Sequence, residues 1–179
     1  IGVAQNVMDP KFYKDLVAQW PTQELFQYKE SLGDKYSLSE VNNPKNYHSF
    51  INSTPAYKKL HDWVKSDTFI YALVEYLATR NIDLGFRKIP TANKIKSALR
   101  DIRYNKRRPR FPSDLSARFE FSMLPIDGGS IRPHTDAAQK IITVVLSIID
   151  EDEWPSEVGG GTQIVWPKDN SKSFNPKNA

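Results

Sequence analysis

The hydrophobic pattern of this chain changes its period once, close to Pro112, and that change limits the folds that the chain can form. Before Pro112, apolar residues recur three and four positions apart, as they do along one face of an α-helix. After it, apolar and polar residues alternate, which is typical of a half-buried β-strand. A helical half followed by a β-rich half indicates an α+β fold, with helices that buttress a sheet or jelly roll.

Helix starts in the first half are marked by residues that favour the first turn of a helix. Asp9-Pro10 predicts one start, because Asp can cap a helix and Pro suits its first position. Thr54-Pro55 predicts a second, and Ser66 or Asp67 a third. The third helix is expected to carry its apolar residues on one face, namely Phe69, Ile70, Leu73, Val74 and Leu77.

The remaining parts of the helical half give weaker signals. A short helix capped by Thr22 is expected to end near Gly33. The polar stretch 34–53 contains Asn42-Asn43-Pro44 and is expected to form a loop. Apolar spacing over 92–103 predicts one more helix.

Several strands are expected after Pro112. Residues Leu115 to Met123 alternate and predict a half-buried strand, and Ile126 to Gly129 predict a turn after it. Ile131 to Asp136 can be extended. The β-branched run from Ile141 to Ile149 is expected to be a strand buried on both faces, and Thr162 to Trp166 a short strand.

The composition excludes several classes of site. Cysteine is absent, which removes disulfide scaffolds, thiolate zinc sites and cysteine nucleophiles. The absence of cysteine also favours a cytoplasmic protein. The longest apolar run, Ile141 to Ile149, is too short to span a bilayer, and we expect neither a membrane segment nor a signal peptide in this soluble protein. The three histidines are His48, His61 and His134. His61 lies in a helical pattern and is expected at a helix surface or in packing, and His48 is not expected to be a ligand.

The segment His134-Thr135-Asp136 is the strongest candidate for a functional site. In an extended backbone, side chains two residues apart project from the same face. An imidazole nitrogen and a carboxylate oxygen can then converge on one metal ion. Iron(II) oxygenases hold their metal with two histidines and one carboxylate and leave the other positions open. The segment would supply two of these three ligands.

The order of motifs around this segment resembles the core of the Fe(II)/2-oxoglutarate oxygenases, in particular the prolyl 4-hydroxylase-like branch. The resemblance covers Ser116 to roughly Pro167, and the motifs that carry it are Gly128-Gly129-Ser130-Ile131-Arg132-Pro133-His134-Thr135-Asp136, Thr143-Val144-Val145-Leu146, and Gly159-Gly160-Gly161-Thr162-Gln163-Ile164-Val165-Trp166-Pro167. It implies a double-stranded β-helix (jelly-roll) core. The expected organisation is a single domain, 1–179, with mainly helical support in 1–111 and a partial core in 112–179.

The resemblance also implies a site and a reaction. His134 and Asp136 would bind Fe(II), and 2-oxoglutarate and O2 would be cosubstrates in the hydroxylation of a C–H bond. Ser147, Thr162 and Arg132 are the candidates for contacts with 2-oxoglutarate. The substrate, a small molecule or a protein side chain, is not identified by the sequence.

The family pattern has two further parts that this chain does not show. A second histidine and a following Arg or Lys normally lie on a later strand, but no residue after Asp136 is a histidine or an arginine. We expect the chain to be a fragment that stops before that strand.

A different class of function stays open on the sequence alone. Lys94 to Arg118 contains nine basic and two acidic residues, with the densest run at Lys106 to Arg110. Such a patch can bind nucleic acid or another polyanion, although a solvated surface loop is the commoner explanation. The alternative is therefore a non-catalytic jelly-roll binding module.

Overall fold

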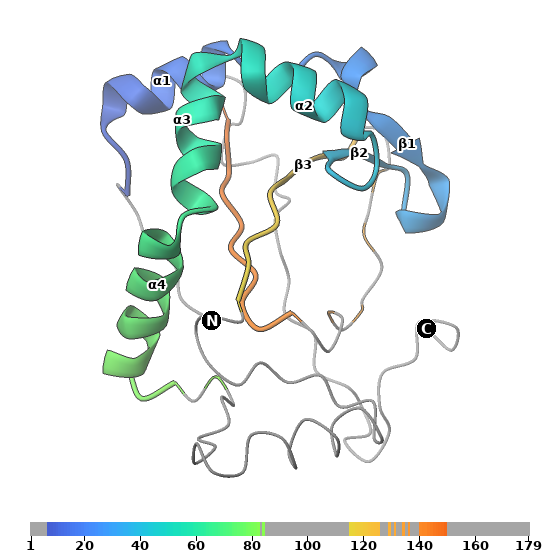
Figure 1. Cartoon of the computed structure of the whole chain (residues 1–179). Helices are drawn as coiled ribbons and strands as arrows, with labels where there is room; N and C mark the ends of the chain where they lie inside the picture. Colours follow the sequence, from blue (N-terminus) through green and yellow to red (C-terminus); the bar gives the residue numbers. More distant parts are fainter. Residues whose placement is uncertain are drawn as a thin grey trace, which may run out of the picture. The chain divides into compact units, whose positions relative to one another are not determined.

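The computed structural model describes residues 7–82, 84, 115–125, 129, 131, 134, 136 and 140–149 (Figure 1). Within these residues the chain forms four α-helices and a three-stranded antiparallel sheet, so the α+β class is confirmed. The chain divides into two compact units, and each takes residues from both halves of the sequence. The first unit contains Ile1–Lys59, Glu120–Thr135 and Val144–Ala179; the second contains Leu60–Phe119 and Asp136–Thr143.

Helix starts lie where the capping residues predict them. Helix α1 (Pro10–Ala18) begins after Asp9, whose carboxylate accepts a hydrogen bond of 3.0 Å from the backbone N–H three residues on. Helix α4 (Asp67–Thr79) begins after Ser66, whose hydroxyl accepts a bond of 3.2 Å from the equivalent N–H. Both bonds satisfy backbone donors that the first turn of a helix leaves without partners.

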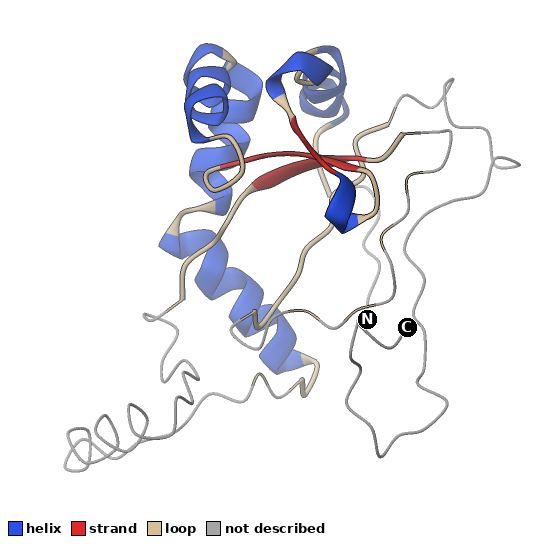
Figure 2. Cartoon of the chain, turned by 90° about the vertical axis from the view of Figure 1, so that its right-hand side faces the viewer, coloured by secondary structure: helices blue, strands red, loops and turns tan. Residues whose placement is uncertain are grey.

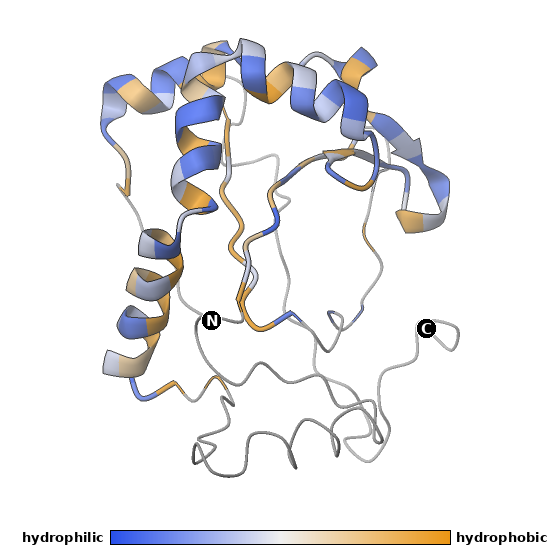
Figure 3. Ribbon diagram, in the orientation of Figure 1, coloured by the Kyte–Doolittle hydropathy of each residue, from blue (hydrophilic) through white to orange (hydrophobic). Residues whose placement is uncertain are grey.

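Helices α3 and α4 also confirm their predicted positions. Helix α3 (Pro55–Val64) follows directly after Thr54. Hydrophobic residues lie along one face of helix α4, as the orange colour along one side of its ribbon shows in Figure 3. The residues of that face are half-buried, and every other residue of α4 is exposed; the half-buried set is Phe69, Ile70, Leu73, Val74 and Leu77.

The prediction of a loop over 34–53 is wrong. The stretch contains strand β2 (Lys35–Ser39) and helix α2 (Pro44–Ser53), both labelled in Figure 1; Figure 2 draws all strands in red and all helices in blue. Although the composition of the stretch is polar, five of its residues are buried: Ser37, Leu38, Ser39, Tyr47 and Ile51. Helix propensity and hydropathy are weak guides where tertiary partners cover polar side chains.

The predicted short helix before Gly33 is replaced by shorter elements. Two 3₁₀ turns, Gln23–Leu25 and Glu30–Leu32, flank strand β1 (Gln27–Lys29). Gly33 does end this segment, in the left-handed conformation with φ of 84° that glycine adopts readily. Strand β1 then pairs with β2 in a hairpin.

Strand β3 (Glu120–Met123) completes the sheet along the other edge of β2, and the strand order is β1-β2-β3. The alternation predicted for 115–123 is confirmed. The residues on the inward face are half-buried or buried, whereas Ser116, Arg118 and Ser122 are exposed; the inward residues are Leu115, Ala117, Phe119, Phe121 and Met123. Only the last part of this stretch pairs as a strand in the described structure.

One face of the sheet packs against an aromatic cluster centred on Phe121. Its ring centroid lies 5.1 Å from that of Tyr57, 5.4 Å from Phe50, 5.7 Å from Trp20 and 6.3 Å from Tyr47. The interplanar angles are steep, which is the edge-to-face arrangement that aromatic quadrupoles favour. Phe121 therefore joins β3 to the end of α1 and to helices α2 and α3.

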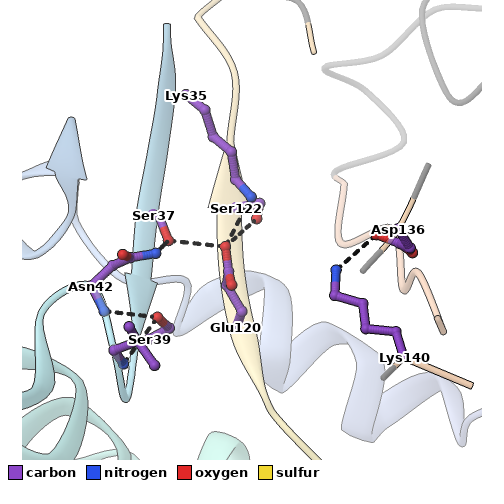
Figure 4. A network of polar contacts seen from close by, with 9 residues as sticks. Lys35, Ser37, Ser39, Asn42, Glu120, Ser122, Asp136 and Lys140 are labelled. Carbon is purple, nitrogen blue, oxygen red and sulfur yellow. Dashed lines mark hydrogen bonds and ion pairs between the residues drawn. The ribbon is translucent and has the colours of Figure 1, made fainter. Parts of the chain in front are cut away.

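The other face of the sheet is polar and internally hydrogen-bonded (Figure 4). Oε1 of Glu120 accepts bonds from Lys35 Nζ at 2.8 Å and Ser37 Oγ at 2.9 Å. Ser37 Oγ accepts from Asn42 Nδ2, and Ser39 Oγ accepts from the backbone N–H of Asn42. These bonds offset the cost of burying the hydroxyls of both serines, which are fully buried.

The prediction that Ile141–Ile149 is a strand buried on both faces is wrong for this structure. No residue of 141–149 pairs in the described sheet. Val144 and Val145 are 61% and 70% exposed. A β-branched run is buried only when strands flank both edges and layers cover both faces, and the described part of the chain does not provide them.

Other expectations fall on residues outside the described set. These include the helix at 92–103, the strand at 162–166 and most of the basic patch. The prediction of one domain over 1–179 stays a prediction. Within the described residues no helix has the length and hydropathy needed to cross a membrane.

Replacing Phe121 by Ala should lower the free energy of unfolding by about 3–5 kcal/mol, because it removes the ring at the centre of the cluster and leaves a cavity. Chemical denaturation monitored by tryptophan fluorescence measures this loss. Phe119→Ala is the matched control: Phe119 is only half-buried, so its loss should be clearly smaller. Equal losses would contradict the central role of Phe121.

Stability should also fall at high pH because of buried tyrosines. Burial is the main reason that the pKa values of Tyr57 and Tyr47 are raised. The unfolded chain releases these protons near pH 10, whereas the folded protein still holds them. Their contribution to stability is thus complete below about pH 10 and is lost as the pH rises toward the folded pKa values.

Tyr57→Phe tests this origin of the pH dependence. At neutral pH the variant loses the bond of 2.9 Å from Tyr57 Oη to the carbonyl oxygen of Leu16, which should cost about 1 kcal/mol. Above pH 10 its unfolding free energy should fall less steeply than that of the wild type. An unchanged slope in urea titrations at several pH values would show that Tyr57 does not cause the decline.

Candidate metal site

A glycine turn connects β3 to the candidate site. The backbone N–H of Gly129 donates a bond of 3.1 Å to the carbonyl oxygen of Pro125 and closes the turn that the sequence predicts here. A Cβ at position 129 would lie 2.3 Å from Cδ of Pro125. Only glycine allows this approach of the chain to the proline ring.

The two predicted metal ligands follow this turn, and both are exposed. His134 belongs to the first compact unit, and Asp136 to the second. The prediction that their side chains share one face depends on the backbone at Thr135, which lies outside the described residues.

The carboxylate of Asp136 is held by two side chains that follow it in sequence. Thr143 Oγ1 donates a bond of 2.6 Å to Oδ2. Lys140 Nζ lies 2.8 Å from Oδ1 and forms an ion pair with it, drawn as a dashed line in Figure 4. The Thr143 distance is in the range of hydroxyl bonds to ionised carboxylates. The carboxylate is therefore oriented by a donor on each oxygen.

Ser147, a predicted 2-oxoglutarate contact, lies in a segment fixed to helix α1 by Tyr13. The Tyr13 hydroxyl lies 3.0 Å from the carbonyl oxygen of Ile149 and 3.4 Å from that of Ser147, and it accepts a bond of 3.1 Å from the Ile149 N–H. These contacts involve the backbone of Ser147, and the residue is exposed. The other predicted contacts, Arg132 and Thr162, lie outside the described residues.

The remaining histidines do not join this site in the described structure. The His61 ring packs edge-on against Phe119 at a centroid distance of 5.9 Å, which confirms its prediction as a packing residue. His48 is exposed on α2, with its ring 5.2 Å from that of Tyr47.

The donor atoms fit Fe(II) in kind, because an imidazole nitrogen and a carboxylate oxygen are its usual ligands. Among the described residues no group of three or more His, Cys, Asp or Glu side chains is close enough to hold a metal. The assignment of His134 and Asp136 as two ligands of a metal stays a prediction.

Thr143, Lys140 and Tyr13 are the residues of this region that the sequence did not reveal as partners. Thr143 stands out as a polar residue within an apolar run, and Lys140 lies four residues after Asp136. Tyr13 follows the apolar spacing of α1, so nothing in the sequence marks its hydroxyl as an anchor for a distant segment.

Comparison of the chain with protein-family models, with curated proteins and with solved structures finds no match. The resemblance to the oxygenases therefore stays a prediction that depends on the motifs quoted above.

Tyr13→Phe tests the anchor of residues 147–149. The variant removes the oxygen that accepts the bond from the Ile149 N–H, so hydrogen exchange of this amide should become about three to ten times faster. Tyr28→Phe is the matched control, because the Tyr28 hydroxyl donates to Asp34 instead. Exchange at Ile149 that is equally fast in wild type and both variants would contradict the anchor.

Proposed function

We propose that this chain carries part of the active site of an Fe(II)- and 2-oxoglutarate-dependent dioxygenase. The observation that carries the proposal is the carboxylate of Asp136, which is exposed and accepts a hydrogen bond of 2.6 Å from Thr143 Oγ1. Metal-binding carboxylates are commonly oriented in this way by neighbouring hydrogen-bond donors.

The order of the elements supports the same proposal. Strand β3 ends at Met123, Gly129 bonds back to Pro125, and the exposed His134 and Asp136 precede a β-branched segment. The proposed core is a double-stranded β-helix in a cytoplasmic protein.

Each residue would have a limited role in the reaction. His134 would bind the metal through an imidazole nitrogen, and Asp136 through a carboxylate oxygen. The bound iron, with 2-oxoglutarate and O2, supplies the oxidation of a substrate C–H bond. Thr162, Ser147 and Arg132 are the proposed contacts to the cosubstrate. The substrate is a small molecule or a protein side chain.

Anaerobic titration of the protein with Fe(II) and 2-oxoglutarate tests the proposal. Chelation of the iron by the cosubstrate should give a visible metal-to-ligand charge-transfer band. His134→Ala and Asp136→Asn should each weaken binding at least about tenfold and abolish the band at matched concentrations.

His48→Ala is the matched control, because it removes an exposed imidazole on α2. This variant should keep the band of the wild type. A wild-type protein that gives no band, or a band that survives in His134→Ala, would overturn the assignment.

A further inference from the structure

The two donors on the Asp136 carboxylate differ in charge, and they take different oxygens. Thr143 is neutral and binds Oδ2, whereas Lys140 is cationic and binds Oδ1. An ionised carboxylate has about four lone-pair directions. Lys140 therefore lies against a different oxygen of the carboxylate from the one that Thr143 binds.

The contact between Lys140 and Asp136 is one that an arriving cation can displace. Both side chains are accessible, with 49% of Lys140 and 39% of Asp136 exposed. Exposed ion pairs of this kind contribute little to stability. Neither residue lies in a helix of the described structure.

A divalent cation on Oδ1 and the ammonium of Lys140 could not share that oxygen, because like charges a few ångströms apart repel. The hydroxyl of Thr143 has no charge and can keep its bond to Oδ2 when a metal is bound. A bound cation would therefore displace Lys140 and leave the hydrogen bond from Thr143 in place.

We propose that Thr143 is a positioning residue that holds the Asp136 carboxylate ready for a metal, and that Lys140 occupies the place of the cation until the metal displaces it. This inference rests on the proposed function, because it takes Asp136 as a metal ligand. It adds a determinant of metal affinity to that site and an internal competitor for it.

Titration of the full chain with Mn(II) alone, monitored by electron paramagnetic resonance, tests both residues without turnover. Thr143→Val removes the hydroxyl at nearly constant volume and should weaken Mn(II) binding about tenfold, the lower end of such effects. Thr143→Ser keeps the hydroxyl and should restore most of the affinity. Equal affinity in wild type and Thr143→Val would overturn the role of Thr143.

The second arm concerns Lys140. Lys140→Gln removes the competing cation and should tighten Mn(II) binding about threefold. The expected effect is small because an exposed ion pair contributes little free energy. Lys140→Arg keeps the charge and should bind as the wild type does. Lys45→Gln makes the same change in net charge at an exposed position on α2 and should leave the affinity unchanged. If Lys140→Gln behaves as Lys45→Gln does, the role of Lys140 is overturned.

His134→Ala separates this inference from the proposed function. If Mn(II) binding is insensitive to His134→Ala but responds to Thr143→Val and Lys140→Gln as stated, the two residues control a cation site at Asp136 and the proposed iron site fails. If neither the wild type nor Lys140→Gln binds Mn(II), both proposals fail. Loss of binding in His134→Ala together with the two expected shifts supports both.

Discussion

The packing of Phe121 against rings from three other segments is the interaction on which the first unit of this protein depends. Trp20, Phe50 and Tyr57 come from the first third of the chain, and Phe121 comes from far beyond it. Their contact closes a long loop, which costs conformational entropy. The burial of several large rings at one point offsets that cost and fixes β3 beside β2.

The position of β3 also determines which side chains lie on each face of the sheet. Because side chains alternate along a strand, Phe121 on one face requires Glu120 on the other. Ser37 and Lys35 of β2 then donate to the carboxylate of Glu120. The strand leads directly into the turn at Pro125 and Gly129, so the aromatic core also fixes where the segment toward His134 begins.

Sequence patterns predicted the features that depend on local chemistry. The caps at Asp9 and Ser66 and the alternation around Phe121 need only neighbours along the chain. Strand β2 was missed because Ser37 and Ser39 look like solvent-exposed residues. Their burial is tolerated because Asn42 bonds to both serines and Ser37 also donates to Glu120, which lies more than eighty residues away. No local pattern contains that information.

At the candidate site the same division applies. The sequence could single out His134 and Asp136 by their spacing, but not the donors that hold the carboxylate of Asp136.

The segment 141–149 shows that the local residue pattern and the contacts with distant residues determine different properties. Its β-branched residues predict a strand, yet burial is a property of neighbours, and in the described structure the segment is held at two points instead. Thr143 bonds to Asp136, and the backbone of Ser147 and Ile149 bonds to Tyr13. The residues between these points, Val144 to Leu146, are exposed and form no strand in the described structure. Thr143 belongs to the second compact unit, and Ser147 and Ile149 belong to the first. Each contact therefore orders the part of the segment that lies in its own unit, and neither contact can be inferred from the β-branched pattern.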